Sequence, residues 1–255
     1  MSADLALRRL RPEISWHRGG AELAPAASLG AFAQAARRGA EFVEVDLRRT
    51  GDGALVCVHD ADLPGLGAVS ELSWSSPAVR RAAAGRVFEL GQFLDVLDEE
   101  DPGRRSGIHL DLKEVGFEGE AVDAVLGRAR RLFVTSSEEA SVSAVRAARP
   151  EVAALLTLGR DGRGLRPAEL ARLRAGELVP FSRVERSGAT GVAVHYLLAT
   201  PALRAVCRLR GLTVVVWTVD GDRQLARWLG RRYVAVVVTD RPLAATALRD
   251  RAVAR

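Results

Sequence analysis

The residues whose types could do chemistry gather first between positions 41 and 60. Side chains alternate faces along a strand, so Glu44 and Asp46 point to the same side. Two carboxylates this close repel each other unless a proton or a cation lies between them, and Mg²⁺ and Ca²⁺ prefer carboxylate oxygens. An Asp-Gly turn too short for a helix predicts an antiparallel hairpin over 54–59, which brings His59 back opposite them. Taken alone, these twenty residues fit a solvated edge strand with a chance histidine equally well.

Two further strand ends carry polar side chains. A short strand near residue 15 ends in His17 and Arg18, and the strand over 107–113 places three polar groups on one face, His109, Asp111 and Lys113. Three polar groups on one face of a central strand cannot all be buried unpaired, so this face is expected to line a site. Lys113 is the only lysine among 37 basic residues, which points to a place where a compact ammonium is needed instead of a planar guanidinium.

These groups together suit one kind of reaction. Cations beside a carboxylate-bound divalent metal favour an anionic substrate whose negative charge rises in the transition state, and phosphoryl transfer fits best. Two imidazoles can serve as general base and general acid near neutral pH. The sequence contains no serine-histidine-aspartate order, phosphate-binding P-loop or zinc spacing that competes with this interpretation.

The elements that must position these residues predict an α/β fold, a TIM (β/α)8 barrel. Strands alternate with helical segments, which favours right-handed crossovers and a parallel sheet. A β-hairpin follows the second strand, and we expect an insertion at about 61–106 to lie over the barrel mouth. Residues 1–255 are expected to form a single domain, with the polar groups at the C-terminal strand ends. The eight expected strands lie near 14–16, 41–47, 107–113, 132–136, 152–157, 191–196, 212–220 and 233–240.

Composition excludes several other classes of protein. An apolar content of 48% and a charged content of 27% are ordinary for a globular protein, and the apolar runs are too short to form an integral membrane segment. The charged N-terminus lacks a signal-peptide pattern, so a cytoplasmic location is expected. The net charge of +5 comes from scattered arginines without a basic run, which argues against nucleic acid as a partner. Cys57 and Cys207 form no CxxC pair and are expected to be structural thiols.

The motifs resemble those of the glycerophosphodiester phosphodiesterase family. The resemblance implies a phosphatidylinositol-phospholipase-like barrel that binds Mg²⁺ or Ca²⁺ and splits a small-molecule glycerophosphodiester into glycerol 3-phosphate and an alcohol. It extends over nearly the whole chain except 61–106 and 158–188. The motifs that carry it are His17-Arg18-Gly19, Glu44-x-Asp46, His59-Asp60, Asp111-x-Lys113, Trp217-Thr218-Val219 and Thr239-Asp240-x-Pro242.

The resemblance also implies roles for individual residues. His17 and His59 would be the catalytic acid/base pair, and Arg18 and Lys113 would bind the substrate phosphate. The remaining predicted site residues are Glu44, Asp46 and Asp111 as metal ligands, and Trp217 and His195 in the substrate pocket.

The chain departs from the family pattern at several positions. Ala26 and Ala27 replace a Glu-Asn pair, Asp111 is one methylene shorter than the usual glutamate, Asp220 replaces an asparagine, and 63–67 replaces the usual Leu-x-Arg-Thr-Thr. These changes bear on substrate identity and rate more than on reaction type. Two alternatives remain: a lysophospholipase D-like enzyme acting on a lipid, and a catalytically weak relative that only binds phosphodiesters. The sequence leaves open the alcohol moiety, the physiological metal and the oligomeric state.

Overall fold

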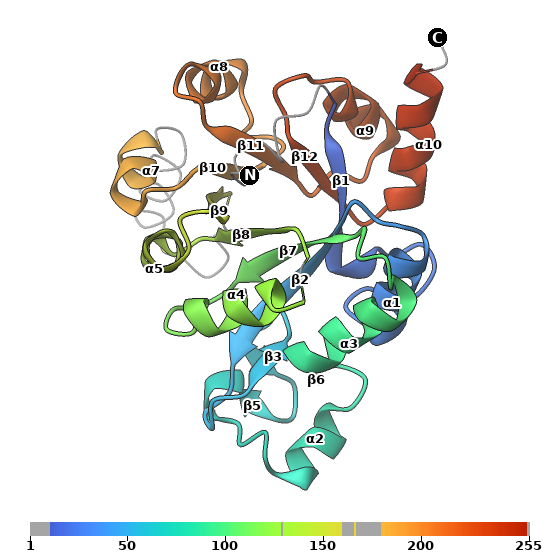
Figure 1. The fold of residues 1–255 in the computed structure, drawn as a ribbon, viewed down its shortest axis with the longest axis vertical. Helices are drawn as coiled ribbons and strands as arrows, with labels where there is room; N and C mark the ends of the chain where they lie inside the picture. Colours follow the sequence, from blue (N-terminus) through green and yellow to red (C-terminus); the bar gives the residue numbers. More distant parts are fainter. Residues whose placement is uncertain (1–10, 129, 160–165, 167–179, 254–255) are drawn as a thin grey trace.

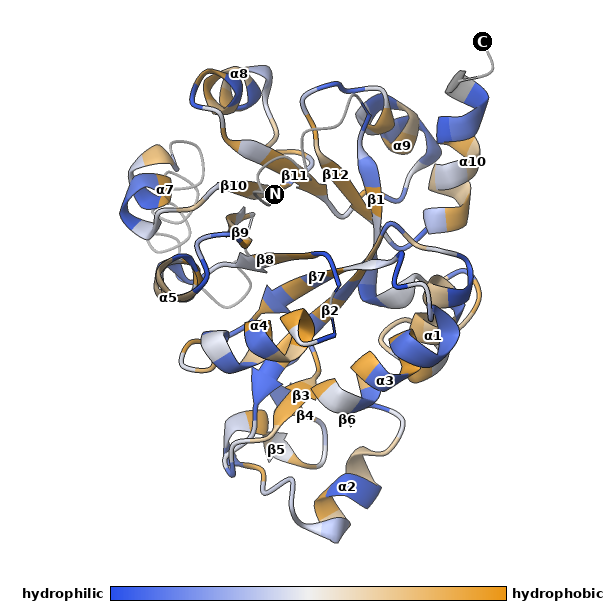
Figure 2. Ribbon diagram, in the orientation of Figure 1, coloured by the Kyte–Doolittle hydropathy of each residue, from blue (hydrophilic) through white to orange (hydrophobic). Residues whose placement is uncertain are grey.

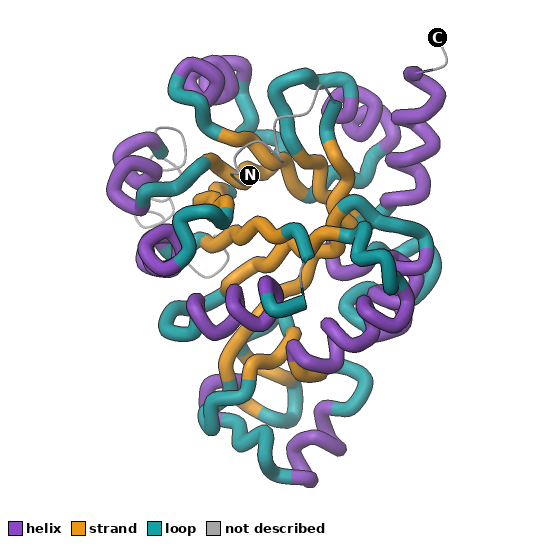
Figure 3. Tube along the Cα trace, in the orientation of Figure 1, coloured by secondary structure: helices purple, strands orange, loops and turns teal. Residues whose placement is uncertain are grey.

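The computed structural model describes residues 11–128, 130–159, 166 and 180–253. Eight parallel strands pair in sequence order, and pairing of the first with both the second and the last closes them into a barrel (Figures 1 and 3). The expected TIM barrel is therefore confirmed. Its strands are β1 (Glu13–Trp16), β2 (Phe42–Arg49), β7 (Gly107–Leu112), β8 (Leu132–Ser136), β9 (Ala153–Leu158), β10 (Gly191–His195), β11 (Thr213–Trp217) and β12 (Val236–Thr239).

The helices lie around the outside of the strands (Figure 1). The first of them begins after Ser28, whose Oγ accepts a hydrogen bond from Ala31 N, and ends before Gly39 at φ +67, as the sequence predicted. Most of the loop and short helix expected after 158 lie outside the described residues. The described barrel helices are α1 (Leu29–Arg37), α3 (Leu90–Glu100), α4 (Glu118–Leu126), α5 (Glu139–Ala148), α7 (Phe181–Ser187), α8 (Pro201–Leu209), α9 (Asp222–Leu229) and α10 (Pro242–Val253).

Strand alternation divides the core into two layers. Val43, Val45 and Leu47 on β2 belong to the large layer between strands and helices, whereas Phe42 packs inside the barrel against Phe133 at a ring distance of 4.8 Å. Gly107 lies opposite Phe42 because a Cβ there would come within 2.5 Å of the ring. The barrel interior is thus filled by apolar side chains at one end. The polar positions of β2 lie nearer its C-terminal end.

The hairpin after β2 forms as expected. Strand β3 (Leu55–Cys57) runs antiparallel to β2 and pairs on its other side with β6 (Phe88–Glu89). The intervening segment forms a small lobe with its own apolar core, seen beside β2 and β3 at the lower end of Figure 1. This lobe contains β4 (Asp62–Leu63), β5 (Gly67–Ala68), the 3-10 helix η3 (Val69–Glu71) and α2 (Pro77–Ala83).

The insertion contributes no residue from 61–106 to the lining of the central cavity described below. It flanks the site instead of forming its wall. Both cysteines are buried and free, in agreement with a structural role. Within the described part of the chain, no helix combines the length and the apolar character needed to cross a membrane.

Candidate active site

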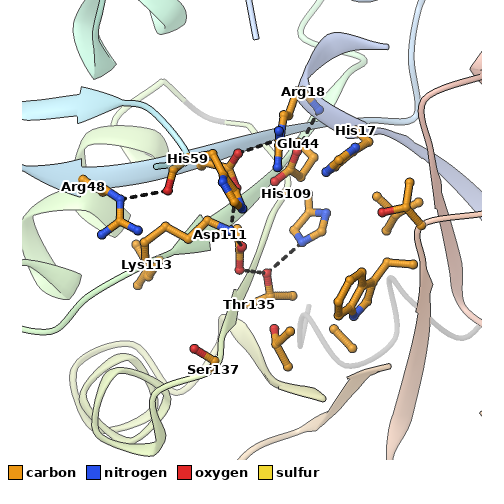
Figure 4. A pocket seen from close by; sticks show the side chains of 17 residues that line it. His17, Arg18, Glu44, Arg48, His59, His109, Asp111, Lys113, Thr135 and Ser137 are labelled. Atoms are coloured by element: carbon orange, nitrogen blue, oxygen red, sulfur yellow. Dashed lines mark hydrogen bonds and ion pairs between the residues drawn. The ribbon is translucent and has the colours of Figure 1, made fainter. Parts of the chain in front are cut away.

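A cavity of about 450 Å³ opens at the C-terminal ends of the barrel strands (Figure 4). All residues predicted for catalysis, phosphate binding and metal binding line it, together with Trp217. The predicted site residues in the lining are His17, Arg18, Glu44, Asp46, His59, Asp111, Lys113 and Trp217.

Three carboxylates meet on one wall of the cavity. Asp46 and Asp111 are register partners on β2 and β7, and one oxygen from each of them and from Glu44 lies within 4.8 Å of the others. Burial, reinforced by the charge of Asp46, raises the pKa of Glu44 to about 8. Asp46 Oδ1 is buried and lies 2.7 Å from Lys113 Nζ as an ion pair. A cluster of carboxylate oxygens, two of them from buried residues, fits a hard divalent cation.

Two cations neutralise part of this charge. Arg18 donates its backbone N–H to Glu44 Oε2 at 2.7 Å, and its Nε lies 2.9 Å from Asp46 Oδ2 as an ion pair without hydrogen-bond alignment. Lys113 Nζ lies 2.7 Å from Asp46 Oδ1 and also contacts Asp111. Burial favours the neutral form of Asp46, but the charges of Lys113 and Arg18 outweigh it and hold the pKa of Asp46 below its usual range.

The turn after β1 fixes the position of Arg18. Its backbone is left-handed at φ 50, an unfavourable conformation for a non-glycine residue, and Gly19 follows because a Cβ there would lie 2.9 Å from Ala31. Ala27 donates its N–H to Arg18 O and is itself left-handed at φ 56. Asparagine tolerates this conformation better than alanine. Ala27 therefore supports the turn at some cost in backbone strain.

His17 is held by a residue at the far end of the chain. Its Nδ1 lies 2.8 Å from Oδ1 of Asp240, just beyond β12, the strand that pairs with β1. Burial opposes protonation of His17, but the hydrogen bond to Asp240 and the negative charges of Glu44 and Asp240 outweigh burial, so the pKa of His17 is raised. Asp240 is oriented in turn, because its N–H donates to Asp220 Oδ1 at 2.9 Å.

His59 approaches from the hairpin. Its Nδ1 lies 2.8 Å from Oδ1 of the adjacent Asp60, and its carbonyl accepts a hydrogen bond from Arg48 Nε at 2.9 Å. Arg48 also reaches Glu114 at 3.5 Å, which links the hairpin to the end of β7. Figure 4 shows His17 and His59 beside the carboxylates; His17 follows β1 and His59 follows β3.

His109 belongs to a buried network that orients Asp111. The Thr135 hydroxyl donates to Asp111 Oδ1 at 2.6 Å, so its single hydrogen is used and His109 Nε2 must donate to Thr135 Oγ1, 2.9 Å away. The other ring nitrogen lies 3.1 Å from Ser15 Oγ. Burial lowers the pKa of His109 to about 3, so this histidine is neutral and positions Asp111.

The opposite side of the cavity is less polar, with Trp217, Ala193 and Val238 in the lining. His195, predicted for the substrate pocket, is not among the lining residues. Its ring packs against Trp217 in an edge-to-face arrangement, with 5.3 Å between the ring centroids.

Sequence reasoning assigned no role to four residues that position the site: Asp240, Arg48, Glu114 and Thr135. The motif containing Asp240 was the one available signal, but only the pairing of β12 with β1 reveals its partner.

Comparison with known proteins gives a consistent result. The model of the glycerophosphoryl diester phosphodiesterase family matches residues 17–244. A glycerophosphodiester phosphodiesterase of Caldanaerobacter subterraneus subsp. tengcongensis is 22% identical over 254 residues, covering 89% of this chain and 93% of the relative. A Mycobacterium tuberculosis protein named "Probable glycerophosphodiester phosphodiesterase 2" is 40% identical over 79 residues, covering 29% of this chain and only 28% of that relative's length.

A solved structure has the same fold. A phosphodiesterase from Oleispira antarctica, in complex with the product sn-glycerol-3-phosphate, superposes with a TM-score of 0.72 at 20% identity, covering 98% of this chain and 100% of that chain.

Proposed function

Because this chain belongs to the glycerophosphoryl diester phosphodiesterase family, we propose that it hydrolyses glycerophosphodiesters to glycerol 3-phosphate and an alcohol with the help of a bound divalent metal ion. Membership places the chain in the enzyme class expected from its sequence, the glycerophosphodiester phosphodiesterases. The observation that carries the proposal is the meeting of three carboxylates, two cations and two histidines in one cavity. The glycerol 3-phosphate bound by the Oleispira antarctica relative supports the identity of the product.

The charges of the site support a metal ion. Glu44, Asp46 and Asp111 bring three negative charges when ionised, and Arg18 and Lys113 bring two positive ones. With a divalent cation and a singly charged phosphodiester added, the net charge of these groups would be zero. Burial and the charge of Asp46 raise the pKa of Glu44, and a bound cation would offset both effects. We assign these three carboxylates as ligands of Mg²⁺ or Ca²⁺, which supplies Lewis-acid polarisation of the phosphoryl group when bound.

The basic side chains would hold the substrate. Lys113 lies between Asp46 and Asp111, so its ammonium can contact a phosphate oxygen while remaining paired. Arg18 lies on the other side of Asp46, where its guanidinium can bind a second oxygen. Trp217 provides an apolar surface for the glycerol carbons. These contacts would orient the phosphorus between the two histidines.

His17 and His59 would transfer the protons. One takes a proton from the attacking oxygen, and the other gives a proton to the oxygen of the leaving alcohol. Asp240 fixes the ring of His17 and Asp60 that of His59, each through Nδ1, so Nε2 of both rings is free to act on substrate. Their origin on β1 and on the hairpin lets them approach the phosphate from different directions.

The test removes the metal and one ligand separately. Hydrolysis of glycerophosphocholine, glycerophosphoethanolamine and glycerophosphoglycerol should cease in EDTA and return with Mg²⁺, Mn²⁺ or Ca²⁺. Asp46→Asn should lower kcat on the order of 10³-fold or more and weaken metal binding measured by calorimetry. Asp62→Asn, an exposed carboxylate change outside the cavity, is the matched control. Undiminished turnover by Asp46→Asn in metal-free buffer would contradict the metal assignment.

A further inference from the structure

Arginines without acidic partners gather on α8, α9 and the turn that follows. Elsewhere, arginines commonly pair with carboxylates, as in Arg128 with Asp98 and Arg149 with Asp123. Among the described residues, six arginines of the α8–α9 region make no ion pair: Arg204, Arg208, Arg223, Arg227, Arg231 and Arg232.

The geometry brings several of these charges close together. The guanidinium carbons of Arg204 on α8 and Arg227 on α9 each lie 5.5 Å from the ring centroid of the buried Trp228. Burial, followed by the positive charges of Arg231 and Arg227, lowers the pKa of Arg204. Like charges held this close destabilise the fold unless an anion approaches them. The cluster is therefore suited to an external negative partner.

Two large apolar side chains accompany the arginines. Leu209, at the end of α8, is 85% exposed, and Tyr233 is 53% exposed with Arg208 lying 4.3 Å from its ring centroid. Figure 2 shows hydrophilic residues interspersed with apolar ones along both helices. We call Leu209, Tyr233 and the six arginines the α8–α9 surface.

The α8–α9 surface includes the end of the barrel opposite the active site. Leu209 directly precedes β11 in the fold and Tyr233 precedes β12, so both lie near the N-terminal ends of these strands. The cavity lies at the C-terminal ends. A partner bound here would leave the cavity mouth open to solution.

We propose that the α8–α9 surface binds the anionic face of a phospholipid bilayer. Guanidinium groups pair with lipid phosphates, and Leu209 and Tyr233 enter the boundary between headgroups and acyl chains. Single-stranded nucleic acid is a poorer match, because bases need open aromatic faces. Trp228 is buried, and the guanidinium of Arg208 occupies one face of the Tyr233 ring, which is otherwise 53% exposed. Bound in this way, the protein would hold its mouth away from the bilayer and draw its substrate from solution. The proposal is independent of the catalytic function.

The test uses vesicles of equal parts phosphatidylglycerol and phosphatidylcholine, with pure phosphatidylcholine vesicles for comparison. The full chain should sediment with the anionic vesicles only, and added salt should release it. The combined Arg204→Gln, Arg227→Gln and Arg231→Gln variant should bind on the order of 100-fold more weakly. The matched control is Arg38→Gln, Arg80→Gln and Arg81→Gln, which removes the same charge from exposed arginines elsewhere. This control should bind nearly as well as the native chain.

A second variant distinguishes a loss of vesicle binding from a loss of folding. Leu209→Ser changes a side chain that packs against little and should weaken vesicle binding several-fold while the circular dichroism spectrum and the turnover of soluble substrate stay unchanged. Equal losses in the two triple variants would mean that net charge alone drives binding, and would overturn the proposal. Failure of the native chain to bind anionic vesicles, or preference for an oligonucleotide over them, would also overturn it.

Discussion

The two histidines at the cavity are held in contrasting ways. The side chain of His17 is 19% exposed and its partner Asp240 is 35% exposed, and the two come from opposite ends of the chain across paired barrel strands. The side chain of His59 is 46% exposed and its partner Asp60, the next residue, is 73% exposed. One ring is fixed by the closed sheet and the other by a short hairpin.

The two histidine rings therefore differ in how firmly the fold holds them in place. Any displacement of His17 must disturb β1 or β12, which are continuous with the barrel core. The backbone near His59 is tied by Val58 N–H to Asp46 O at 3.0 Å and by the Arg48 hydrogen bond to the His59 carbonyl. His59 thus depends on a few local bonds, which suits a group that must adjust as substrate enters.

The largest expected effects test whether both histidines react. His17→Ala and His59→Ala should each lower kcat about 10²–10⁴-fold on an unactivated glycerophosphodiester, with little change in KM. The measurement must use the natural leaving group, since an activated one does not need a general acid. Near-native kcat in either variant would show that the histidine concerned has a structural role. Only the other histidine would then transfer a proton.

The next effect sharpens the contrast between the two aspartates. Asp240→Asn keeps an acceptor oxygen but removes the negative charge that helps to raise the pKa of His17, so the pKa of His17 should fall. Whether His17 acts as base or acid, the limb of the kcat/KM profile that belongs to it should move to lower pH. We expect a loss of roughly 10–100-fold in kcat at neutral pH from the weakened orientation of the ring.

Asp60→Asn is the matched control for Asp240→Asn. Because Asp60 is largely exposed, water can replace its contact with His59, and only a loss of a few-fold is expected. Equal losses in the two variants, with no movement of either pH limb in Asp240→Asn, would contradict the distinction between a sheet-held and a hairpin-held histidine.

Much of the fold followed from local pattern. The barrel strands are short apolar runs that end in polar residues, and the Asp-Gly turn predicted the β2–β3 hairpin. The inside of the insertion was not predictable, because its short strands and turns rest on tertiary contacts. Asp52 shows why: its carboxylate accepts hydrogen bonds from the backbone of Trp74 and Ser75, more than twenty residues away.

The residues of the candidate site were predictable from the sequence, but the hydrogen bonds and ring contacts that connect them were not. Motif spacing brought Glu44, Asp46 and Asp111 together because β2 and β7 are neighbours, a relation implied by the barrel itself. The pairing of His17 with Asp240 requires knowledge of which strand closes the barrel. His195 packs against Trp217 and does not line the cavity. This position depends on side-chain packing, which the alternation of side chains along a strand does not predict.

The smallest expected effect concerns Arg48, which supports only the hairpin-held histidine. Arg48→Met keeps the aliphatic stem and removes the hydrogen bond to the His59 carbonyl and the contact with Glu114. We expect kcat to fall roughly tenfold, equivalent to about 1.4 kcal/mol, with KM nearly unchanged. Arg49→Met is the matched control, because the neighbouring arginine contacts Gly116 and Glu120 outside the cavity lining. A rise in KM without loss of kcat would instead make Arg48 a substrate-binding residue, and the hairpin would then hold His59 without its help.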